Sequence, residues 1–235
     1  MSSKIVAVVP AAGIGSRMNS SIPKQYLKIH KKTIFEHTLE ALLSFDMIDS
    51  VVAVLHPQDE YFSSLGIASH PKLIKVIGGN ERVDSVLAGL KAASVDGKDT
   101  WVMVHDAARP MIQHHNIKHL VEVGKKTGAA ILATPSVDTL KQAESDFDQQ
   151  KQILGIRKTI DRKLIWQAQT PQFAKLSMLI DAIESCPSPE KITDEASALE
   201  MAGHHVSLVE GDASNIKITK PSDLALAEFY LRKTH

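Results

Sequence analysis

The chain has 235 residues, and its 27 Lys and Arg side chains balance 27 Asp and Glu side chains, so its formal net charge is zero. This length suits one large α/β domain with an appendage, and the balanced charge disfavours nucleic acid and anionic membranes as partners. The single cysteine, Cys186, excludes an intrachain disulfide framework. No apolar stretch suits a signal peptide or a membrane span, so we expect a cytoplasmic protein.

The first predicted element is a buried strand over the β-branched run from Ile5 to Val9. It leads into segment 10–18, PAAGIGSRM, whose glycines let the backbone turn sharply beside a ligand. Backbone N–H groups there can bind phosphate oxygens, while Arg17 and Lys24 add positive charge. The dinucleotide and Walker patterns do not fit this spacing. The alternative is an ordinary turn in which both cations are solvated.

The next elements alternate between helix and strand. Apolar periodicity predicts a helix over 33–45, and continuous apolar runs predict buried strands at 51–55 and 73–77, with a short helical piece at 59–65. Helical spacing resumes at Glu81, so Gly78-Gly79-Asn80 forms a second strand-to-helix turn with open N–H groups. This turn could hold a nucleobase or a phosphate.

A further strand at 101–104 ends in His105-Asp106-Ala107-Ala108-Arg109-Pro110, where an acidic and a basic side chain emerge together. In open parallel sheets, ligands bind at the carboxyl ends of the strands. A helix at 116–126 and a strand at 129–133 continue the alternation. We therefore expect an α/β fold with a Rossmann-like, mostly parallel sheet, helices on both faces and a projecting β-hairpin arm.

The arm is predicted at residues 136–160, which are polar and lack a helical apolar stripe. Its strand-like pieces lie near 139–141 and 153–160, and its apolar residues Ile153, Leu154 and Ile156 are available for partner contact. The remaining segments return to the main body of the fold. They are a run from 164 to 168 that leads into Thr170-Pro171-Gln172-Phe173, helices at 176–183 and 194–201, the second with Thr193 as N-cap, strands at 206–209 and 215–219, and a closing helix from Pro221.

Asp106 is a candidate magnesium ligand, because a carboxylate that faces a basic phosphate loop can hold an ion that bridges nucleotide phosphates. The alternative is that Asp106 caps the next turn and pairs with Arg109. Lys217, between Ile216 and Ile218, is either solvated or pointed into the cleft. Without an evident nucleophile, these groups suit transfer of a nucleotidyl group onto an acceptor that carries its own phosphate, which needs no general base.

The assembled motifs resemble the 2-C-methyl-D-erythritol 4-phosphate cytidylyltransferase family of the non-mevalonate isoprenoid pathway. Seven matching stretches run in order over almost the whole chain: PAAGIGSRM, PKQY, GGNERVDSVLAGL, VHDAARP, DRKLIWQAQTPQ, TDEASALE and NIKITKPSDLALAE. The resemblance implies that CTP and methylerythritol phosphate give the CDP-alcohol and pyrophosphate, with Mg²⁺. It also implies a homodimer of single domains over 1–235, with 136–160 as the dimerisation arm.

By the same resemblance, Arg17 and Lys24 stabilise the transition state, and Arg162 and Lys217 position the acceptor phosphate. The nucleotide contacts implied are Ala11, Ala12 and Gly13 at the triphosphate and base, and Gly79, Asn80 and Ser85 at the cytosine and ribose. Asp106 serves the metal, and the acceptor contacts implied are Arg109, Thr139, Thr170 and Thr193. Two alternatives stay open: a ribitol 5-phosphate cytidylyltransferase, and a non-catalytic nucleotide-binding module on the same fold.

Overall fold

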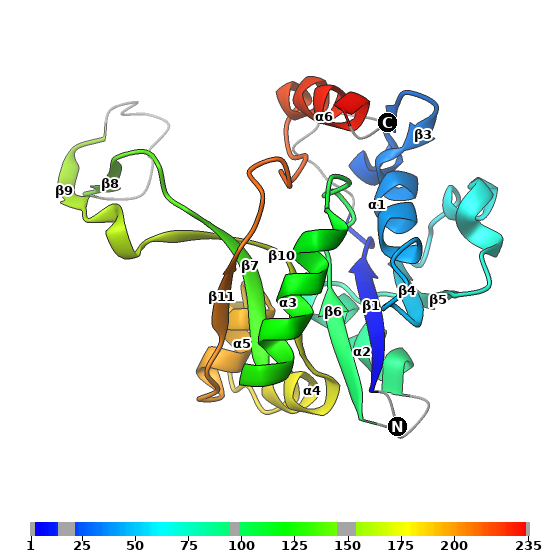
Figure 1. The fold of residues 1–235 in the computed structure, drawn as a ribbon, viewed down its shortest axis with the longest axis horizontal. Coiled ribbons are helices and arrows are strands. Elements are labelled where there is room, and N and C mark those ends of the chain that lie inside the picture. The colour runs from blue at the N-terminus through cyan, green and yellow to red at the C-terminus, as the bar shows by residue number, and fades with distance from the viewer. Residues whose placement is uncertain (1–2, 14–21, 95–98, 145–153, 234–235) are drawn as a thin grey trace.

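A computed structural model describes residues 3–13, 22–94, 99–144 and 154–233 of the chain. Its centre is a seven-stranded sheet in the order β11-β7-β10-β6-β1-β4-β5 (Figure 1). The strands are β1 (Lys4–Pro10), β4 (Ser50–Leu55), β5 (Leu73–Ile77), β6 (Thr100–Val104), β7 (Ala129–Pro135), β10 (Trp166–Lys175) and β11 (Ser207–Glu210). The α-helices are α1 (Ile34–Leu43), α2 (Arg82–Ala93), α3 (His114–Thr127), α4 (Leu176–Glu184), α5 (Glu195–Met201) and α6 (Pro221–Lys233).

The sheet is mostly parallel, which confirms the predicted α/β class. Its exception is β10, which runs antiparallel to both of its neighbours, β6 and β7. The chain leaves the carboxyl end of β7, passes through the arm and re-enters the sheet at the same end, so β10 must run in the opposite direction. Pairing between β10 and β7 is irregular between Ala168 and Gln172, and Pro171 in this stretch has no N–H to donate to a ladder.

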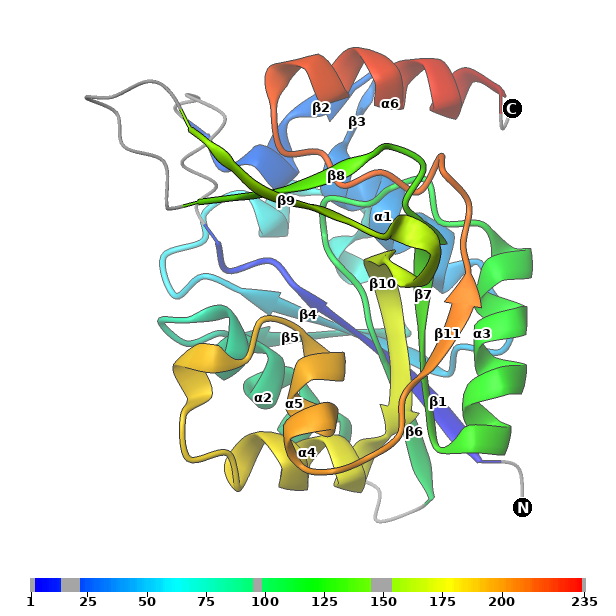
Figure 2. The same cartoon turned by 90° about the vertical axis from the view of Figure 1, so that its left-hand side faces the viewer.

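Helices cover both faces of the sheet, because the side chains of its strands alternate between two apolar clusters. Ile5, Ala7 and Val9 of β1 belong to a cluster with α1 and α3. Val6 and Val8 belong to a second cluster with α2, α4 and α5. Figure 2 shows α3 on one side of the sheet and α2, α4 and α5 on the other. Within the described ranges, no helix combines the length and apolar character needed to cross a bilayer.

A third cluster lies above the carboxyl ends of the central strands and joins segments that are distant in the sequence. It contains Ala108, Ile218, and Ala227 and Leu231 of α6, which packs near the short strands β2 (Lys28–Ile29) and β3 (Lys32–Thr33). Figure 1 shows α6 across this end of the molecule. The packing therefore holds the segment after β6 against the segment that precedes α6.

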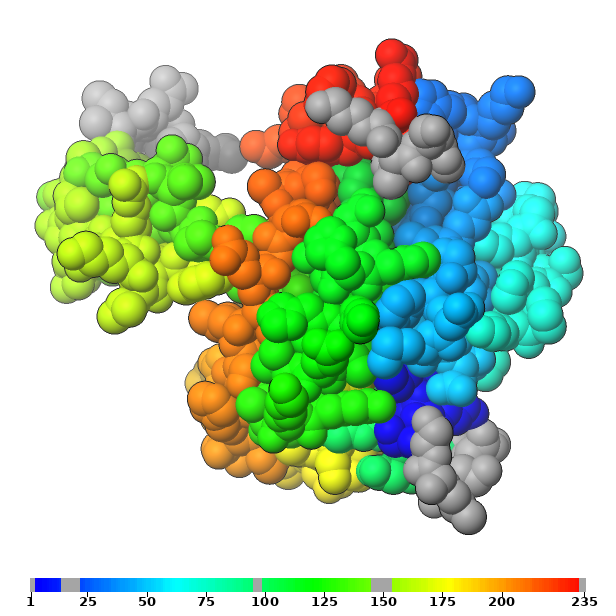
Figure 3. Space-filling model, viewed as in Figure 1, coloured from blue at the N-terminus to red at the C-terminus, as the bar shows by residue number. Residues whose placement is uncertain are grey.

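The arm is a separate two-stranded sheet in which β8 (Leu140–Ala143) pairs antiparallel with β9 (Ile156–Ile160). It projects from the body of the protein, as the space-filling view shows (Figure 3). Val137, Ile156 and Leu164 in and beside it are exposed. Residues 145–153, including Ile153, lie outside the described residues.

Some of the sequence expectations were wrong in detail. Strand β5 is not buried, since it lies at the edge of the sheet and exposes Ile74 and Ile77. The stretch 164–168 does not re-enter the core, because Leu164 is 89% exposed and the buried part of β10 begins at Gln169. Both segments have apolar sequences, which led to the prediction that they are buried. Their exposure depends instead on where they lie relative to the sheet.

Two further expectations, a strand at 215–219 and the N-cap of α5, were also wrong. Residues 215–219 form no strand, because the segment crosses over the strand ends on its way to α6, and Ile218 N donates to Ala108 O at 2.9 Å. The N-cap of α5 is Asp194 rather than Thr193, because the Asp194 carboxylate accepts from Ser197 N at 2.9 Å. The negative charge of a carboxylate cap is also stabilised by the positive end of the helix dipole.

We predict that Gly89→Ala destabilises the protein although alanine is the better helix former by about 1 kcal/mol. A Cβ at position 89 of α2 would lie 2.4 Å from Val8 Cγ1 and 2.8 Å from Val54 Cγ2. Overpacking between a helix and two stiff valines costs roughly 1–3 kcal/mol, so we expect a net loss. Urea unfolding measures it. Lys91→Ala, on the exposed side of the same helix, is the control and should change little; a more stable Gly89→Ala variant would contradict the prediction.

Candidate active site

A cavity of about 450 Å³ opens at the carboxyl ends of β1, β4 and β6. Three of the predicted segments meet in it: the loop after β1, the turn before α2 and the loop after β6. The described residues that line it are Pro10, Ala11, Ala12, Gly13, Lys24, Gln25, His56, Pro57, Gly79, Asn80, Glu81, Arg82, Ser85, Asp106, Ala107, Ala108 and Lys217. Parallel strands bring these loops together because their carboxyl ends share one edge of the sheet.

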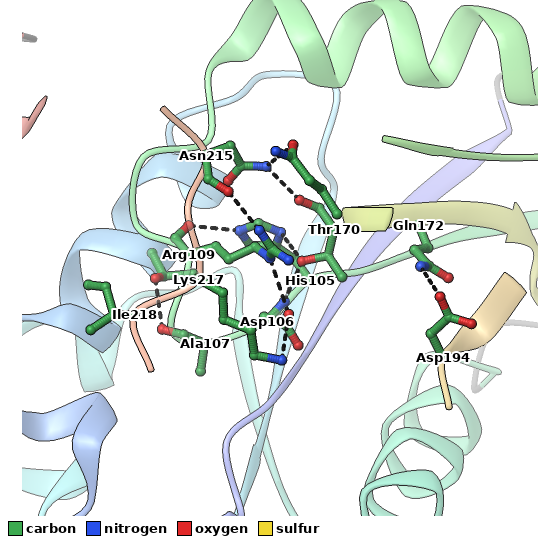
Figure 4. Close-up of polar contacts among 12 residues, drawn as sticks. His105, Asp106, Ala107, Arg109, Thr170, Gln172, Asp194, Asn215, Lys217 and Ile218 are labelled. Atoms are coloured by element: carbon green, nitrogen blue, oxygen red, sulfur yellow. Dashed lines mark hydrogen bonds and ion pairs between the residues drawn. The ribbon is translucent and has the colours of Figure 1, made fainter. Parts of the chain in front are cut away.

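The Asp106 carboxylate on the cavity wall is surrounded by cations from three segments. Its Oδ2 atom lies 3.0 Å from Lys217 Nζ and 3.2 Å from Arg109 Nε, and its Oδ1 atom lies 3.8 Å from Arg82 Nη2. Figure 4 shows Lys217 and Arg109 converging on Asp106. Burial alone would raise the pKa of Asp106, but Lys217, Arg82 and Arg109 hold this pKa well below its usual range. The carboxylate is therefore ionised at neutral pH.

These contacts decide between the two orientations considered for Lys217, and they show the pairing considered for Asp106. Lys217 points into the cavity rather than out to solvent. Asp106 does pair with Arg109, and Arg109 N donates to Asp106 O at 3.1 Å in a tight turn. The pairing does not remove Asp106 from the cavity wall, so it does not exclude a ligand-binding role.

The Lys24-Gln25-Tyr26 turn (η2) is fastened to the glycine loop. Gln25 is buried, and its Nε2 atom donates to Ala11 O at 2.7 Å and to Gly13 O at 3.2 Å. The Tyr26 hydroxyl donates to Asp59 Oδ2 at 2.5 Å. Lys24 Nζ, on the cavity side, donates to Ile218 O at 3.2 Å. The carbonyl groups of Ala11 and Gly13 thus point toward Gln25, while the loop 11–13 also lines the cavity.

The turn before α2 is more closed than its glycines suggest. Gly78 N donates to Leu55 O at 2.8 Å, and Gly79 N donates to the buried Ser85 hydroxyl at 3.2 Å. The expectation of open N–H groups was therefore wrong for these two glycines, because one extends the sheet edge and the other binds a side chain of α2. Asn80 and Ser85 line the cavity beside them.

Sequence reasoning missed an ion pair that borders the cavity. Arg82, the first residue of α2, donates to Glu195 through Nη1 at 2.8 Å and Nη2 at 3.3 Å. Glu195 is 3% exposed at the start of α5. Burial lowers the pKa of Arg82, but the carboxylates of Glu195 and Asp106 outweigh this effect and raise it. The available signal was one basic residue directly after the Gly-Gly-Asn-Glu turn.

The segment 105–109 is held by a second set of buried contacts. His105 is fully buried, with Nδ1 3.0 Å from Thr170 Oγ1 and Nε2 3.0 Å from Arg109 O. Asp106 N donates to Thr170 Oγ1 at 3.0 Å. Arg109 Nη1 donates to Asn215 O at 2.7 Å, and Asn215 Nδ2 donates to Thr170 O at 2.8 Å. Burial lowers the pKa of His105 to about 4, so its ring is neutral.

Several predicted residues are not among those that line the cavity. Arg17 lies outside the described residues. Arg162, in the turn η6 (Arg162–Leu164), donates to Val137 O at the base of the arm, and Thr139 lies next to β8. Thr193 precedes α5, and Thr170 is 4% exposed behind Asp106. Within the described ranges, a single protomer therefore brings only part of the predicted set into one cavity.

The carboxylates at the cavity can serve Mg²⁺ only together with substrate phosphates or water. No group of three or more His, Cys, Asp or Glu side chains suitable for a metal occurs in the described part of the chain. Mg²⁺ is commonly held by one or two carboxylates together with substrate phosphates and waters. Asp106, a carboxylate on the cavity wall, fits that requirement.

The chain is similar to known proteins in both sequence and structure. Residues 5–233 match the family model of 2-C-methyl-D-erythritol 4-phosphate cytidylyltransferase. The curated protein of that name from Vibrio vulnificus strain CMCP6 is 51% identical, covering 97% of this chain and 95% of its own. The one from Escherichia coli O127:H6 is 48% identical, covering 98% and 94%. The crystal structure of the Francisella tularensis protein of that name has a TM-score of 0.80 at 36% identity, covering 97% and 100%.

We predict that Tyr26→Phe flattens the loss of stability at alkaline pH. Burial and the Asp59 contact raise the pKa of Tyr26 far above the value of about 10 expected in the unfolded chain. The wild type therefore keeps the contribution of Tyr26 below about pH 10 and loses it as the pH rises, by up to about 1.4 kcal/mol per pH unit, because only the unfolded phenol ionises. Urea unfolding at pH 9, 10 and 11 measures this loss. Parallel pH profiles for wild type and variant would show that the prediction is wrong.

Proposed function

The chain belongs to the 2-C-methyl-D-erythritol 4-phosphate cytidylyltransferase family, and we propose that it transfers CMP from CTP to 2-C-methyl-D-erythritol 4-phosphate. The products are 4-diphosphocytidyl-2-C-methyl-D-erythritol and pyrophosphate, in isoprenoid precursor biosynthesis by the non-mevalonate route. The observation that carries the proposal is one cavity that joins the glycine loop, Lys24, Asp106 and Lys217. A cytoplasmic location is part of the proposal.

The nucleotide occupies the side of the cavity formed by the two turns. Ala11, Ala12 and Gly13 bind the triphosphate and base with backbone groups, and their carbonyls are partly committed to Gln25. Gly79, Asn80 and Ser85 bind the cytosine and ribose. A Cβ at Gly79 would lie 2.3 Å from Asp84 Cβ, so glycine is required there for close packing.

The acceptor phosphate is the nucleophile, because a phosphate monoester is largely dianionic at neutral pH. One of its oxygens forms a bond to the α-phosphorus of CTP, the bond from that phosphorus to the bridging oxygen of the β-phosphate breaks, and pyrophosphate leaves with the electron pair. Lys24 and Arg17 neutralise charge on the pentacoordinate phosphorus, and Lys217 and Arg162 hold the acceptor phosphate. No protein group has to remove a proton.

Asp106 would hold Mg²⁺ together with the nucleotide phosphates. The ion, when bound, neutralises phosphate charge and orients the triphosphate. The contacts of Oδ2 with Lys217 and Arg109 orient the carboxylate at the cavity wall.

The acceptor side is completed by a second copy of the chain. Thr139 lies on the arm and Arg162 at its base, and the arm projects away from the body of its own protomer. The exposed apolar residues Val137, Ile156 and Leu164 suit burial in a homodimer. We propose that the arm carries Arg162 and Thr139 into the partner's cavity, while Arg109, Thr170 and Thr193 complete the acceptor site.

We predict that pyrophosphate release requires CTP, magnesium and methylerythritol 4-phosphate together, and that Lys24→Ala lowers kcat at least about a hundred-fold by removing transition-state charge. A coupled pyrophosphate assay measures release, with ribitol 5-phosphate and no acceptor as comparisons. Lys28→Ala is the matched control, since Lys28 is exposed in β2 and does not line the cavity. Preference for ribitol 5-phosphate would overturn the acceptor, and CTP binding without turnover would favour a binding module.

A mixing experiment tests the arm. Lys24→Ala and Arg162→Ala should each be nearly inactive, and a refolded equimolar mixture should regain roughly a quarter of wild-type activity. Half of the dimers are mixed, and each mixed dimer holds one site free of both substitutions if Arg162 acts on the partner's cavity. No recovery, with dimers verified by light scattering, would place Arg162 in its own protomer's site.

A further inference from the structure

We propose that Gln25 is a positioning residue that holds the carbonyl oxygens of loop 11–13 away from the nucleotide phosphates, so that the loop meets them with N–H groups. The inference rests on the proposed function, because it concerns how the nucleotide side of that site is shaped. The proposed mechanism uses Lys24 but gives no role to its neighbour Gln25, which is buried on the cavity wall.

The Gln25 amide group holds the loop at two carbonyl groups. Its Nε2 atom lies 2.7 Å from Ala11 O and 3.2 Å from Gly13 O, and a primary amide has two N–H donors, one for each oxygen. A carbonyl oxygen can only accept, so the NH₂ group rather than Oε1 of Gln25 must face the loop. The two contacts therefore require a side chain that donates at this position.

The contact with Gln25 also sets the direction of a neighbouring N–H group. Ala11 N donates to Val54 O at 2.8 Å, so Ala11 is held through both its N–H and its C=O. The peptide bond between Ala11 and Ala12 is trans, and in a trans peptide the C=O and the following N–H point in opposite directions. The N–H of Ala12 consequently points away from Gln25.

The direction of these peptide groups decides whether the loop attracts or repels the nucleotide. A carbonyl oxygen carries partial negative charge and an N–H hydrogen carries partial positive charge, while the triphosphate is an anion. Peptide groups that direct N–H toward the ligand form anion sites. Without a donor at position 25, the carbonyl groups of Ala11 and Gly13 lose their partner, and they regain one only by rotating toward water. The same rotation turns the N–H groups away from the phosphates.

Tyr26 separates this role from simple support of the turn η2. Its hydroxyl anchors the same turn to Asp59 at 2.5 Å, through a contact that does not involve loop 11–13. Loss of the Tyr26 hydroxyl loosens the turn, and Lys24 with it, but leaves both loop carbonyls bound to Gln25. The affinity for CTP should therefore depend on Gln25 and not on the Tyr26 hydroxyl.

The experiment measures the Kd for CTP with magnesium by calorimetry in the absence of acceptor, and both KM values in the pyrophosphate assay. We expect Gln25→Met, which keeps the length of the side chain but has no donor, to raise the Kd and KM for CTP about ten- to a hundred-fold, with KM for the acceptor within about two-fold. Gln25→Glu is isosteric, and its ionised carboxylate also has no donor, so it should weaken CTP at least as much. Tyr26→Phe should keep the Kd for CTP within about two-fold.

Gln113→Met is the matched control. It breaks another bond from a glutamine amide to a main-chain carbonyl, since Gln113 Nε2 donates to Met111 O at 3.0 Å, and Gln113 does not line the cavity. This variant should leave the Kd for CTP and both KM values unchanged, whatever its effect on the Tm.

Three results would overturn the inference. They are a Gln25→Met or Gln25→Glu variant with wild-type affinity for CTP, an equal rise of both KM values in these variants, and a Tyr26→Phe variant that loses as much CTP affinity as Gln25→Met. An inactive wild type whose Kd for CTP still depends on Gln25 in the expected way would refute the proposed function alone.

Discussion

The site depends on one carboxylate. A lone ionised carboxylate with little solvent access costs several kcal/mol to bury, and Asp106 offsets that cost with Lys217, Arg109 and Arg82. These cations in turn would repel one another without it. Each belongs to a different stretch of the chain, so the cluster forms only when the whole fold is assembled. The cationic character that a triphosphate and a phosphate monoester both need is therefore built into the tertiary structure, while the net charge of the protein remains zero.

The topology supplies that assembly. Strands β1, β4 and β6 deliver the glycine loop and Asp106 to one edge of the sheet, and α2 begins with Arg82 at the same edge. The segment before α6 carries Lys217 across the strand ends, where Ile218 packs into the third apolar cluster. Behind Asp106, the irregular part of β10 carries Thr170 next to His105. The groups that line the cavity thus lie mostly on loops, and buried groups beside the strands hold these loops in place.

Patterns within short stretches of the sequence predicted the features that depend on neighbouring residues, namely individual strands, helices and turns. Apolar runs marked β4 and β6, periodicity marked α1 and α2, and the glycine turns with Asp106 marked the strand ends where the cavity lies. Contacts between distant residues could not be read in this way: Arg82 and Glu195 are 113 positions apart, and neither stands out by itself. The reversal of β10 and the exposure of β5 also depend on which strands become neighbours. The N-cap at Asp194 was missed because Thr193 and Asp194 are both good caps, and only the geometry separates them.

In the proposed mechanism Asp106, whose Oδ2 atom lies 3.0 Å from Lys217 Nζ, keeps the Lys217 ammonium group in the position where it binds the acceptor phosphate. A double-mutant cycle on kcat/KM for the acceptor, with Asp106→Asn, Lys217→Met and the combined variant, tests this role most directly. Because each substitution alone leaves the other group without its partner at 3.0 Å, the double variant should be little worse than the more damaging single one, with a coupling of about 1–3 kcal/mol. If the two losses simply multiply, the residues act independently and the account is contradicted.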